Sequence, residues 1–301
     1  MIKNALMRKV TLTKTQVFSV AGLCCLLTGG LCFSATAAEL IIDRETGALN
    51  EMIEEGPARV VVNYAPVEEW TAGVENLKLR VFYEGEPVAN LGIQTGFPNS
   101  SAGVAVQDLD SDGVPEVRIW EFTGGQRCCS LTTVYGLVGD RFTEIDTSLV
   151  DGGLTGRRVE DLNGDGYSEV VRLDEAFFYS FASFAGSAAP PLILTFRDGE
   201  FVNTTREFPE LIRADILQLE QTYLKNPDFR GNPNGFLAAY VANKAMLGEF
   251  EEAWAFMLEN YDPQADLEFV LKIRDESGEV VGYHPDYPTA LRAFLEDRDY
   301  L

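Results

Sequence analysis

The chain has 301 residues and carries 47 acidic against 24 basic side chains, a net charge of −23. The first 38 residues hold four of the basic side chains and no acidic one, so the remainder has 20 basic against 47 acidic side chains, or −27. Such a charge repels phosphate backbones and anionic membranes and attracts cations. We therefore expect no nucleic-acid partner.

Residues 1–38 are predicted to be a signal peptide. A basic start leads into an apolar run, Val17–Phe33, and Ala35-Thr36-Ala37 offers the small residues of a cleavage site. The alternative is a retained anchor, but the run is shorter than the ~20 apolar residues of a spanning helix. We expect a periplasmic or secreted protein with no membrane span after cleavage.

Two adjacent cysteines, Cys128 and Cys129, remain after the leader. Their Cα atoms are ~3.8 Å apart, below the usual disulfide range, so a bond between them would close a strained ring. Three interpretations stay open: a vicinal disulfide, two packed thiols, or a redox or metal site. The absence of a redox motif around the pair favours the first two.

Residues 39–203 are predicted to form a β-repeat region. Arg59–Tyr64 and Leu77–Tyr83 are strand candidates, and hairpins are expected around Gly139 and Gly199.

Two Asp-rich segments in this region, Val106–Gly113 and Val159–Gly166, align 53 residues apart, from Asp108 to Asp161. That period is typical of propeller blades, but two repeats and a partial third cannot close a ring. We predict an α+β fold of antiparallel blade-like β repeats, propeller-like and not closed, followed by a C-terminal helical region.

Residues 204–301 are assigned to that helical region. Apolar residues at helical spacing predict Pro209–Lys225, Gly235–Met246, Glu249–Asn260 and a short terminal helix, Thr289–Leu295. One helical hairpin has the spacing of a single tetratricopeptide-like unit. Because such units stabilise one another in arrays, we favour packing against the sheet over peptide binding.

The two Asp-rich segments are predicted calcium loops, because alternate residues of a tight loop can aim six or seven oxygens at one Ca²⁺ ion. The expected ligands are Asp108, Asp110, Asp112, the Val114 carbonyl and Glu116 in the first loop, and Asp161, Asn163, Asp165, the Tyr167 carbonyl and Glu169 in the second.

Neither loop is an EF-hand, because Ile119 and Arg172 stand where the twelfth-position Glu would be. The alternative is an acidic surface turn with Asx-type capping. Three carboxylates in nine residues repel one another unless a cation offsets them, which favours calcium. Asn163 removes one charge from the second loop, so we expect weaker binding there.

The D-x-[DN]-x-D-G-x-x-E loops resemble the FG-GAP (VCBS-type) repeats of integrin-like propellers and many bacterial surface proteins. At a finer level Gly124–Ser130, Val159–Gly166 and Phe181–Ala185 resemble a group of exported cyanobacterial proteins, over about residues 75–260. Members of that group often have His where this chain has Arg127, which argues against a metal role for the cysteines. The resemblance implies calcium-stabilised β repeats.

Other candidates carry less chemistry. His284, the single histidine, has no nucleophile or metal ligand beside it in the sequence. Asp174-Glu175 could extend the second loop's site or face water. An aromatic run could stack sugars, but we predict a buried strand; its members are Phe177, Phe178, Tyr179, Phe181 and Phe184.

We therefore predict an exported calcium-binding protein that acts as a non-catalytic binding or structural module, with a protein or polysaccharide as its partner. The alternative is a secreted hydrolase that uses acidic residues near the sheet–helix junction.

Overall fold

The structure is a computed structural model that describes residues 38–42, 48–64, 74–95, 102–122, 130–150, 159–225, 232–265, 272–274 and 277–301. Its strands are β1 (Ala38–Ile42), β2 (Ala48–Glu55), β3 (Ala58–Tyr64), β4 (Val74–Tyr83), β5 (Glu86–Thr95), β6 (Ala102–Gln107), β7 (Glu116–Phe122), β8 (Ser130–Val138), β9 (Arg141–Val150), β10 (Val159–Glu160), β11 (Glu169–Leu173), β12 (Pro191–Arg197), β13 (Glu200–Asn203), β14 (Lys272–Arg274) and β15 (Val280–Tyr283). Its helices are α1 (Pro209–Lys225), α3 (Asn234–Met246), α4 (Phe250–Asn260) and α5 (Tyr287–Asp297), with 3-10 turns η2 (Glu175–Phe177), η3 (Phe184–Gly186) and η4 (Thr205–Glu207).

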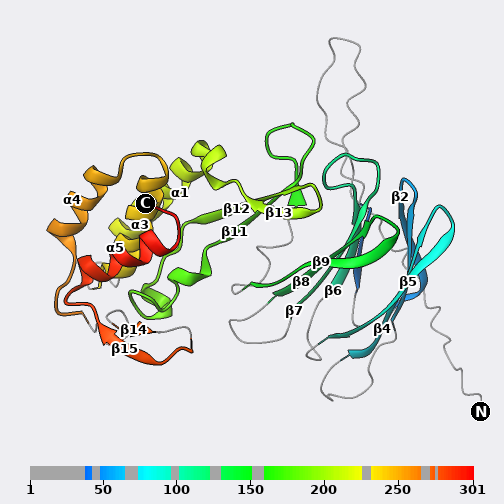
Figure 1. The fold of residues 1–301 in the computed structure, drawn as a ribbon, viewed down its shortest axis with the longest axis horizontal. Coiled ribbons are helices and arrows are strands. Elements are labelled where there is room, and N and C mark those ends of the chain that lie inside the picture. Colours follow the sequence, from blue (N-terminus) through cyan, green and yellow to red (C-terminus); the bar gives the residue numbers. More distant parts are fainter. Residues whose placement is uncertain are drawn as a thin grey trace, which may run out of the picture.

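The described strands form open antiparallel sheets, which lie side by side in Figure 1 with the helices at one end. The N-terminal sheet has the order β2-β3-β4-β5, the central sheet β1-β6-β7-β8-β9, and the third sheet β10-β11-β12-β13. A separate hairpin pairs β14 with β15. All of these pairings are antiparallel.

Alternation along the strands builds the core between the N-terminal and central sheets. In β3 every second residue is buried, including Val60 and Val62. These side chains share one hydrophobic cluster with Val104 and Val106 of β6. Because strand side chains alternate between faces, the other face of β6 is free to meet the third sheet.

That second face is also buried. Gln107, at the end of β6, directs its side-chain amide to the Val159 carbonyl (3.5 Å) and the Ser168 hydroxyl (3.4 Å) of the third sheet. On the same face a Cβ added to Gly103 would lie 2.0 Å from the Trp120 ring, so the indole needs glycine there. The central sheet is therefore packed on both sides.

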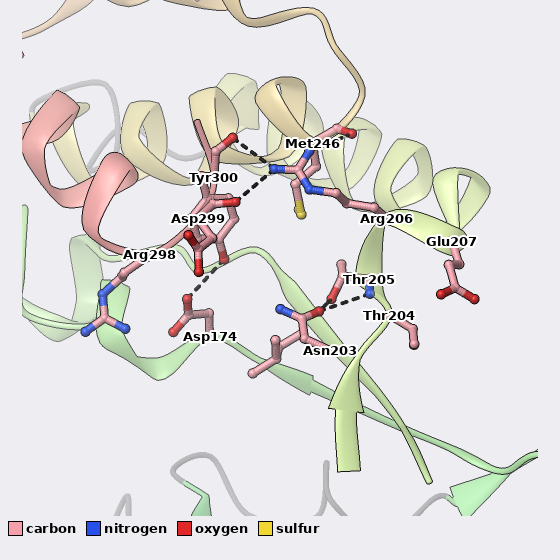
Figure 2. A pocket seen from close by; sticks show the side chains of 11 residues that line it. Asp174, Asn203, Thr204, Thr205, Arg206, Glu207, Met246, Arg298, Asp299 and Tyr300 are labelled. Atoms are coloured by element: carbon pink, nitrogen blue, oxygen red, sulfur yellow. Dashed lines mark hydrogen bonds between the residues drawn. The ribbon is translucent and has the colours of Figure 1, made fainter. Parts of the chain in front are cut away.

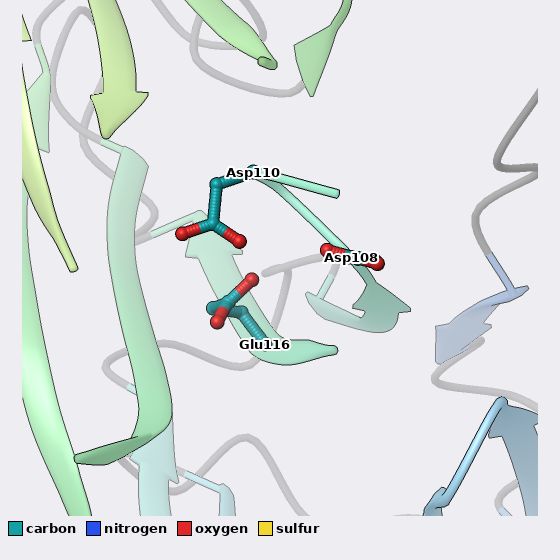
Figure 3. A group of neighbouring side chains, drawn as sticks. All are labelled: Asp108, Asp110 and Glu116. Atoms are coloured by element: carbon teal, nitrogen blue, oxygen red, sulfur yellow. The ribbon is translucent and has the colours of Figure 1, made fainter. Parts of the chain in front are cut away.

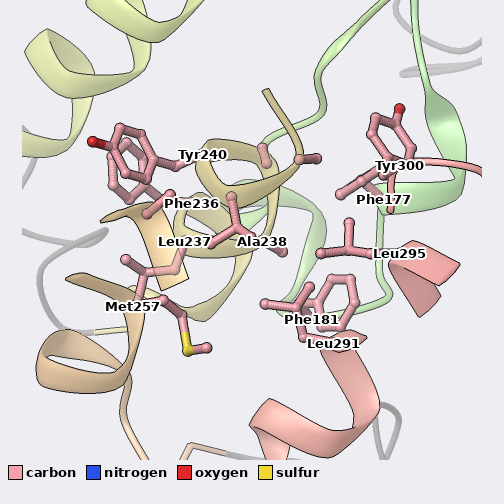
Figure 4. Close-up of a cluster of buried hydrophobic side chains, with 14 of the residues drawn as sticks. Phe177, Phe181, Phe236, Leu237, Ala238, Tyr240, Met257, Leu291, Leu295 and Tyr300 are labelled. Carbon is pink, nitrogen blue, oxygen red and sulfur yellow. The ribbon is translucent and has the colours of Figure 1, made fainter. Parts of the chain in front are cut away.

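The helices form their own core beside the third sheet (Figure 4). Leu237 in α3, Met257 in α4 and Leu291 in α5 are completely buried in one cluster. α5 begins at Tyr287, two residues before the predicted start, because Asp286 caps the amide of Thr289 (2.9 Å). α1 has the predicted bounds.

The prediction that the aromatic run is a buried strand is wrong. The segment between β11 and β12 contains the turns η2 and η3 instead. Phe177 and Phe181 project into the helical core, where both lie edge-on to Phe294 (4.9 and 5.0 Å between centroids), while Tyr179 is 58% exposed. The helical core, which is distant in sequence, overrides the local apolar pattern.

The described architecture confirms an α+β fold of antiparallel sheets followed by helices; a blade-like arrangement of the repeats stays a prediction. Within the described part of the chain, none of the helices combines the length and apolarity needed to cross a membrane. The predicted signal peptide, apart from Ala38, and the pair Cys128 and Cys129 lie outside the described residues.

Candidate metal centre

The first Asp-rich loop connects β6 to β7, whose ends are paired at Gln107 and Glu116. This pairing returns the chain on itself and brings Glu116 under the loop. Oxygen atoms of Asp108, Asp110 and Glu116 lie within 4.8 Å of one another (Figure 3). A small cluster of carboxylate oxygens is the ligand set that a hard divalent cation prefers.

Backbone amides hold this loop in shape. The Gly113 amide donates to Asp108 Oδ2 (2.9 Å), and the Val114 amide donates to Asp112 Oδ1 (2.7 Å). The Leu109 amide donates to Glu116 Oε2 (3.0 Å). Gly113 has a φ of +87°, a left-handed conformation that favours glycine.

The second loop connects β10 to β11 and repeats the same bonds 53 residues later. The Gly166 amide donates to Asp161 Oδ2 (2.9 Å), the Tyr167 amide to Asp165 Oδ1 (3.0 Å), and the Leu162 amide to Glu169 Oε2 (2.8 Å). The two segments that align in sequence therefore also have equivalent hydrogen bonds.

Burial makes the ionised carboxylates of the first loop unfavourable unless a cation lies beside them. Glu116 is 7% exposed, and burial together with the nearby carboxylates raises its pKa to about 8. Burial and the Asp112 charge also raise the pKa of Asp110. Asp108 Oδ1 is buried without a hydrogen-bond partner. A buried carboxylate oxygen without a donor is destabilising unless a cation lies against it.

The second loop differs because a basic side chain lies beside it. Arg197 of β12 places Nη2 3.7 Å from Asp165 Oδ2 and stacks over the Tyr167 ring, 5.5 Å from its centroid. Asn163 also donates to Asp165 Oδ2 (3.1 Å). No described Lys or Arg forms an ion pair with the first loop's carboxylates.

The N-terminal sheet supports the first loop from the other side. Glu55, the last residue of β2, accepts a hydrogen bond from the Asp108 amide (3.3 Å) through Oε1, and its Oε2 is buried without a partner. The Tyr83 hydroxyl donates to the Pro115 carbonyl. No sequence signal marks Glu55, Tyr83 or Arg197 as a neighbour of the loops, because each comes from a strand outside the repeated segment.

The structure gathers three of the predicted first-loop side chains and leaves Asp112 exposed at the loop tip. The three carboxylates of the second loop, those of Asp161, Asp165 and Glu169, are not gathered as closely. The roles of all ten residues as metal ligands, the Val114 and Tyr167 carbonyls included, stay predictions. His284 directly follows β15, in the C-terminal part of the chain.

The sheet–helix junction, where the hydrolase alternative would act, contains a cavity of about 330 Å³ (Figure 2). Two of its charged side chains, Asp174 and Arg206, already have partners within the fold. Asp174 accepts hydrogen bonds from the Ala176 amide (3.1 Å) and the Tyr300 hydroxyl (3.0 Å). Arg206 donates to the carbonyls of Asp299 (2.9 Å) and Tyr300 (3.1 Å). These contacts fasten the C-terminal end to the third sheet.

Comparison with known proteins identifies the family. A family described as the sll0997 C-terminal domain matches residues 212–299, which span nearly all of α1 to α5. The chain is 34% identical over 264 residues to a probable thylakoid lumen protein, sll0997, of Synechocystis sp., covering 84% of this chain and 76% of that protein. It is also 32% identical over 213 residues to an uncharacterized protein, y4bJ, of Sinorhizobium fredii, covering 67% of this chain and 33% of that protein.

The chain therefore belongs to the family of the Synechocystis protein sll0997. This supports the resemblance to exported cyanobacterial proteins and the prediction of an exported protein. No solved structure matches the chain.

Proposed function

We propose that the protein is an exported, non-catalytic calcium-binding module of FG-GAP (VCBS) type, in which Ca²⁺ bound to the Asp-rich loops braces the stacked sheets. The observation that carries this proposal is the convergence of Asp108, Asp110 and Glu116 within 4.8 Å, with no described basic residue to neutralise them. A divalent cation offsets the mutual repulsion of the three carboxylates. It also gives the buried, unpaired Oδ1 of Asp108 a partner.

The position of the first loop supports a structural role for the proposed cation. The loop touches the N-terminal sheet through Glu55 and Tyr83, and the third sheet through Leu109, whose carbonyl accepts from the Ser168 amide (2.7 Å). An ion that orders this loop therefore stabilises contacts of all three sheets. The second loop depends less on a bound cation, because Arg197 beside Asp165 already offsets part of its negative charge.

The family supports the proposed compartment. The relative sll0997 is a probable thylakoid lumen protein, and we assign this chain to a lumenal, periplasmic or secreted location. Its partner is a protein or a polysaccharide.

Thermal unfolding of the mature protein in calcium, in magnesium and in chelator tests the proposal. Calcium at a hundred times its dissociation constant stabilises a folded protein by ~2.7 kcal/mol. We expect calcium to raise the melting temperature more than magnesium, since magnesium demands a tighter octahedral site. An unmoved melting temperature, with Asp112→Ala and Asp165→Ala equally silent, would refute calcium binding.

A further inference from the structure

The two Asp-rich loops touch each other directly. Ser111 Oγ, at the tip of the first loop, donates a hydrogen bond to the Gly166 carbonyl of the second loop (2.6 Å). A Cβ added to Gly166 would lie 3.3 Å from the Ser111 hydroxyl, so the tips are in contact as well as bonded. The residues that make this bond stand between predicted ligands in both loops.

A second bond crosses between the loops at their base. The Leu109 carbonyl accepts from the Ser168 amide (2.7 Å), while the Leu109 amide donates to Glu116 Oε2 (3.0 Å). Ser168 immediately precedes Glu169, the last predicted ligand of the second loop. One residue, Leu109, therefore connects a first-loop ligand to the backbone beside a second-loop ligand.

Two features of the first loop favour a bound cation. Glu116 is 7% exposed, uses one oxygen to accept from Leu109, and faces Asp108 and Asp110 (Figure 3). Asp108 Oδ1 is buried and has no partner. The gathered carboxylates and the unpaired buried oxygen of Asp108 both favour a bound cation.

Two bound Ca²⁺ ions repel each other, and this repulsion opposes cooperative binding. The first loop has four carboxylates and the second has three, so each loop stays negative after it binds one Ca²⁺. These carboxylates attract each ion separately but do not cancel the repulsion between the two ions, which is weakened only by their separation and by screening in water at the exposed loop tips. A favourable coupling between the loops therefore has to come from the backbone that they share. The first ion orders this backbone, so the second ion binds at a smaller entropic cost.

We infer that the two loops bind Ca²⁺ with positive cooperativity, transmitted by the Ser111–Gly166 and Leu109–Ser168 hydrogen bonds. This inference rests on the proposed function. Binding at either loop fixes the peptide units that carry these bonds, and so increases the affinity of the other loop by the same factor.

Calcium titration calorimetry on the mature chain tests the coupling. Asp165→Asn weakens the second loop while keeping an oxygen that accepts from the Tyr167 amide. We expect it to lower the first loop's affinity about fivefold. Asp112→Asn, which keeps the acceptor for the Val114 amide, should lower the second loop's affinity by the same factor.

The serine variants separate coupling from binding. Two variants, Ser111→Ala and Ser111→Gly, remove the cross-loop hydroxyl. Glycine tolerates the φ of +60° at this position, so a loss of coupling that both variants share is not caused by backbone strain. In either background Asp165→Asn should change the first loop's affinity much less than in the wild type. Thr222→Ala is the matched control, because its hydroxyl also donates to a carbonyl (2.8 Å) but lies in α1.

Two results would overturn the inference, and they differ in what they imply for the proposed function. If calcium binds but Asp165→Asn and Asp112→Asn leave the other loop's affinity unchanged, the loops are independent and calcium binding stands. If no calcium binds to the wild-type chain, both the cooperativity and the proposed function fail.

Discussion

Replacing Glu116 with glutamine separates a cation site from an acidic turn. Glutamine has the same shape and keeps an oxygen that can accept from the Leu109 amide, 3.0 Å away in the wild type. Its amide group can donate to Asp108 or Asp110 at any pH, whereas Glu116 repels them as soon as it ionises. The variant therefore stabilises the loop in chelator and removes a charged ligand in calcium.

The gain in stability expected for Glu116→Gln in chelator follows from the pKa of Glu116. Burial and the neighbouring carboxylates raise this pKa from 4.5 to about 8. At pH 7 the folded chain keeps a proton on Glu116 that the unfolded chain has lost, so stability falls as pH rises from about 4.5 to 8. At 1.36 kcal/mol per pH unit, the 2.5 units between pH 4.5 and pH 7 destabilise the wild type by about 3 kcal/mol, and glutamine removes this loss.

Calcium should reverse the order of the two proteins. At a thousand times its dissociation constant calcium stabilises the wild type by ~4.1 kcal/mol, and Glu116→Gln should respond much less. For a chain of this size that response is roughly 10 °C in melting temperature. Circular dichroism melts of both proteins, in chelator and in calcium, measure it. Equal calcium responses would show that Glu116 is not a ligand, and a variant less stable in chelator would contradict the electrostatic reasoning.

Three other outcomes test the packing. Gly103→Ala should destabilise by ~1–3 kcal/mol in urea unfolding, because its Cβ would overlap the Trp120 ring at 2.0 Å; an unchanged midpoint would contradict this close approach. Burial raises the pKa of Glu121 to about 7, so the stability of the wild type should fall between pH 4.5 and 7. Glu121→Gln should therefore be more stable than the wild type by roughly 1–3 kcal/mol at pH 8 and equally stable at pH 4. Phe177→Ala, which removes an edge-on contact with Tyr300 at 5.5 Å, should destabilise by ~3–5 kcal/mol; a loss below 1 kcal/mol in chemical unfolding would show that the helical core does not depend on this ring.

Local chemistry made much of this fold predictable. The hairpin turns at Gly139 and Gly199 have positive φ values, which the sequence signals through glycine. α1 has the bounds that its spacing predicts, from Pro209 to Lys225. The two loops also share their internal hydrogen bonds, because each bond joins residues at most seven positions apart.

Other features depend on residues far apart in the sequence. The aromatic run satisfied the pattern of a buried strand, but Phe177 and Phe181 pack against α5, more than a hundred positions later. Glu55, which contacts Asp108, comes from the N-terminal sheet and carries no motif.

The Asp-rich loops were thus identifiable from the sequence, because their spacing and glycines are local properties. The two loops differ in charge for two reasons. The sequence supplies Asn163 in place of a carboxylate, and the tertiary structure adds Arg197 beside the second loop alone. The contact between the loops, through Ser111 and Gly166, was decided only when the sheets packed, because it joins residues 55 positions apart.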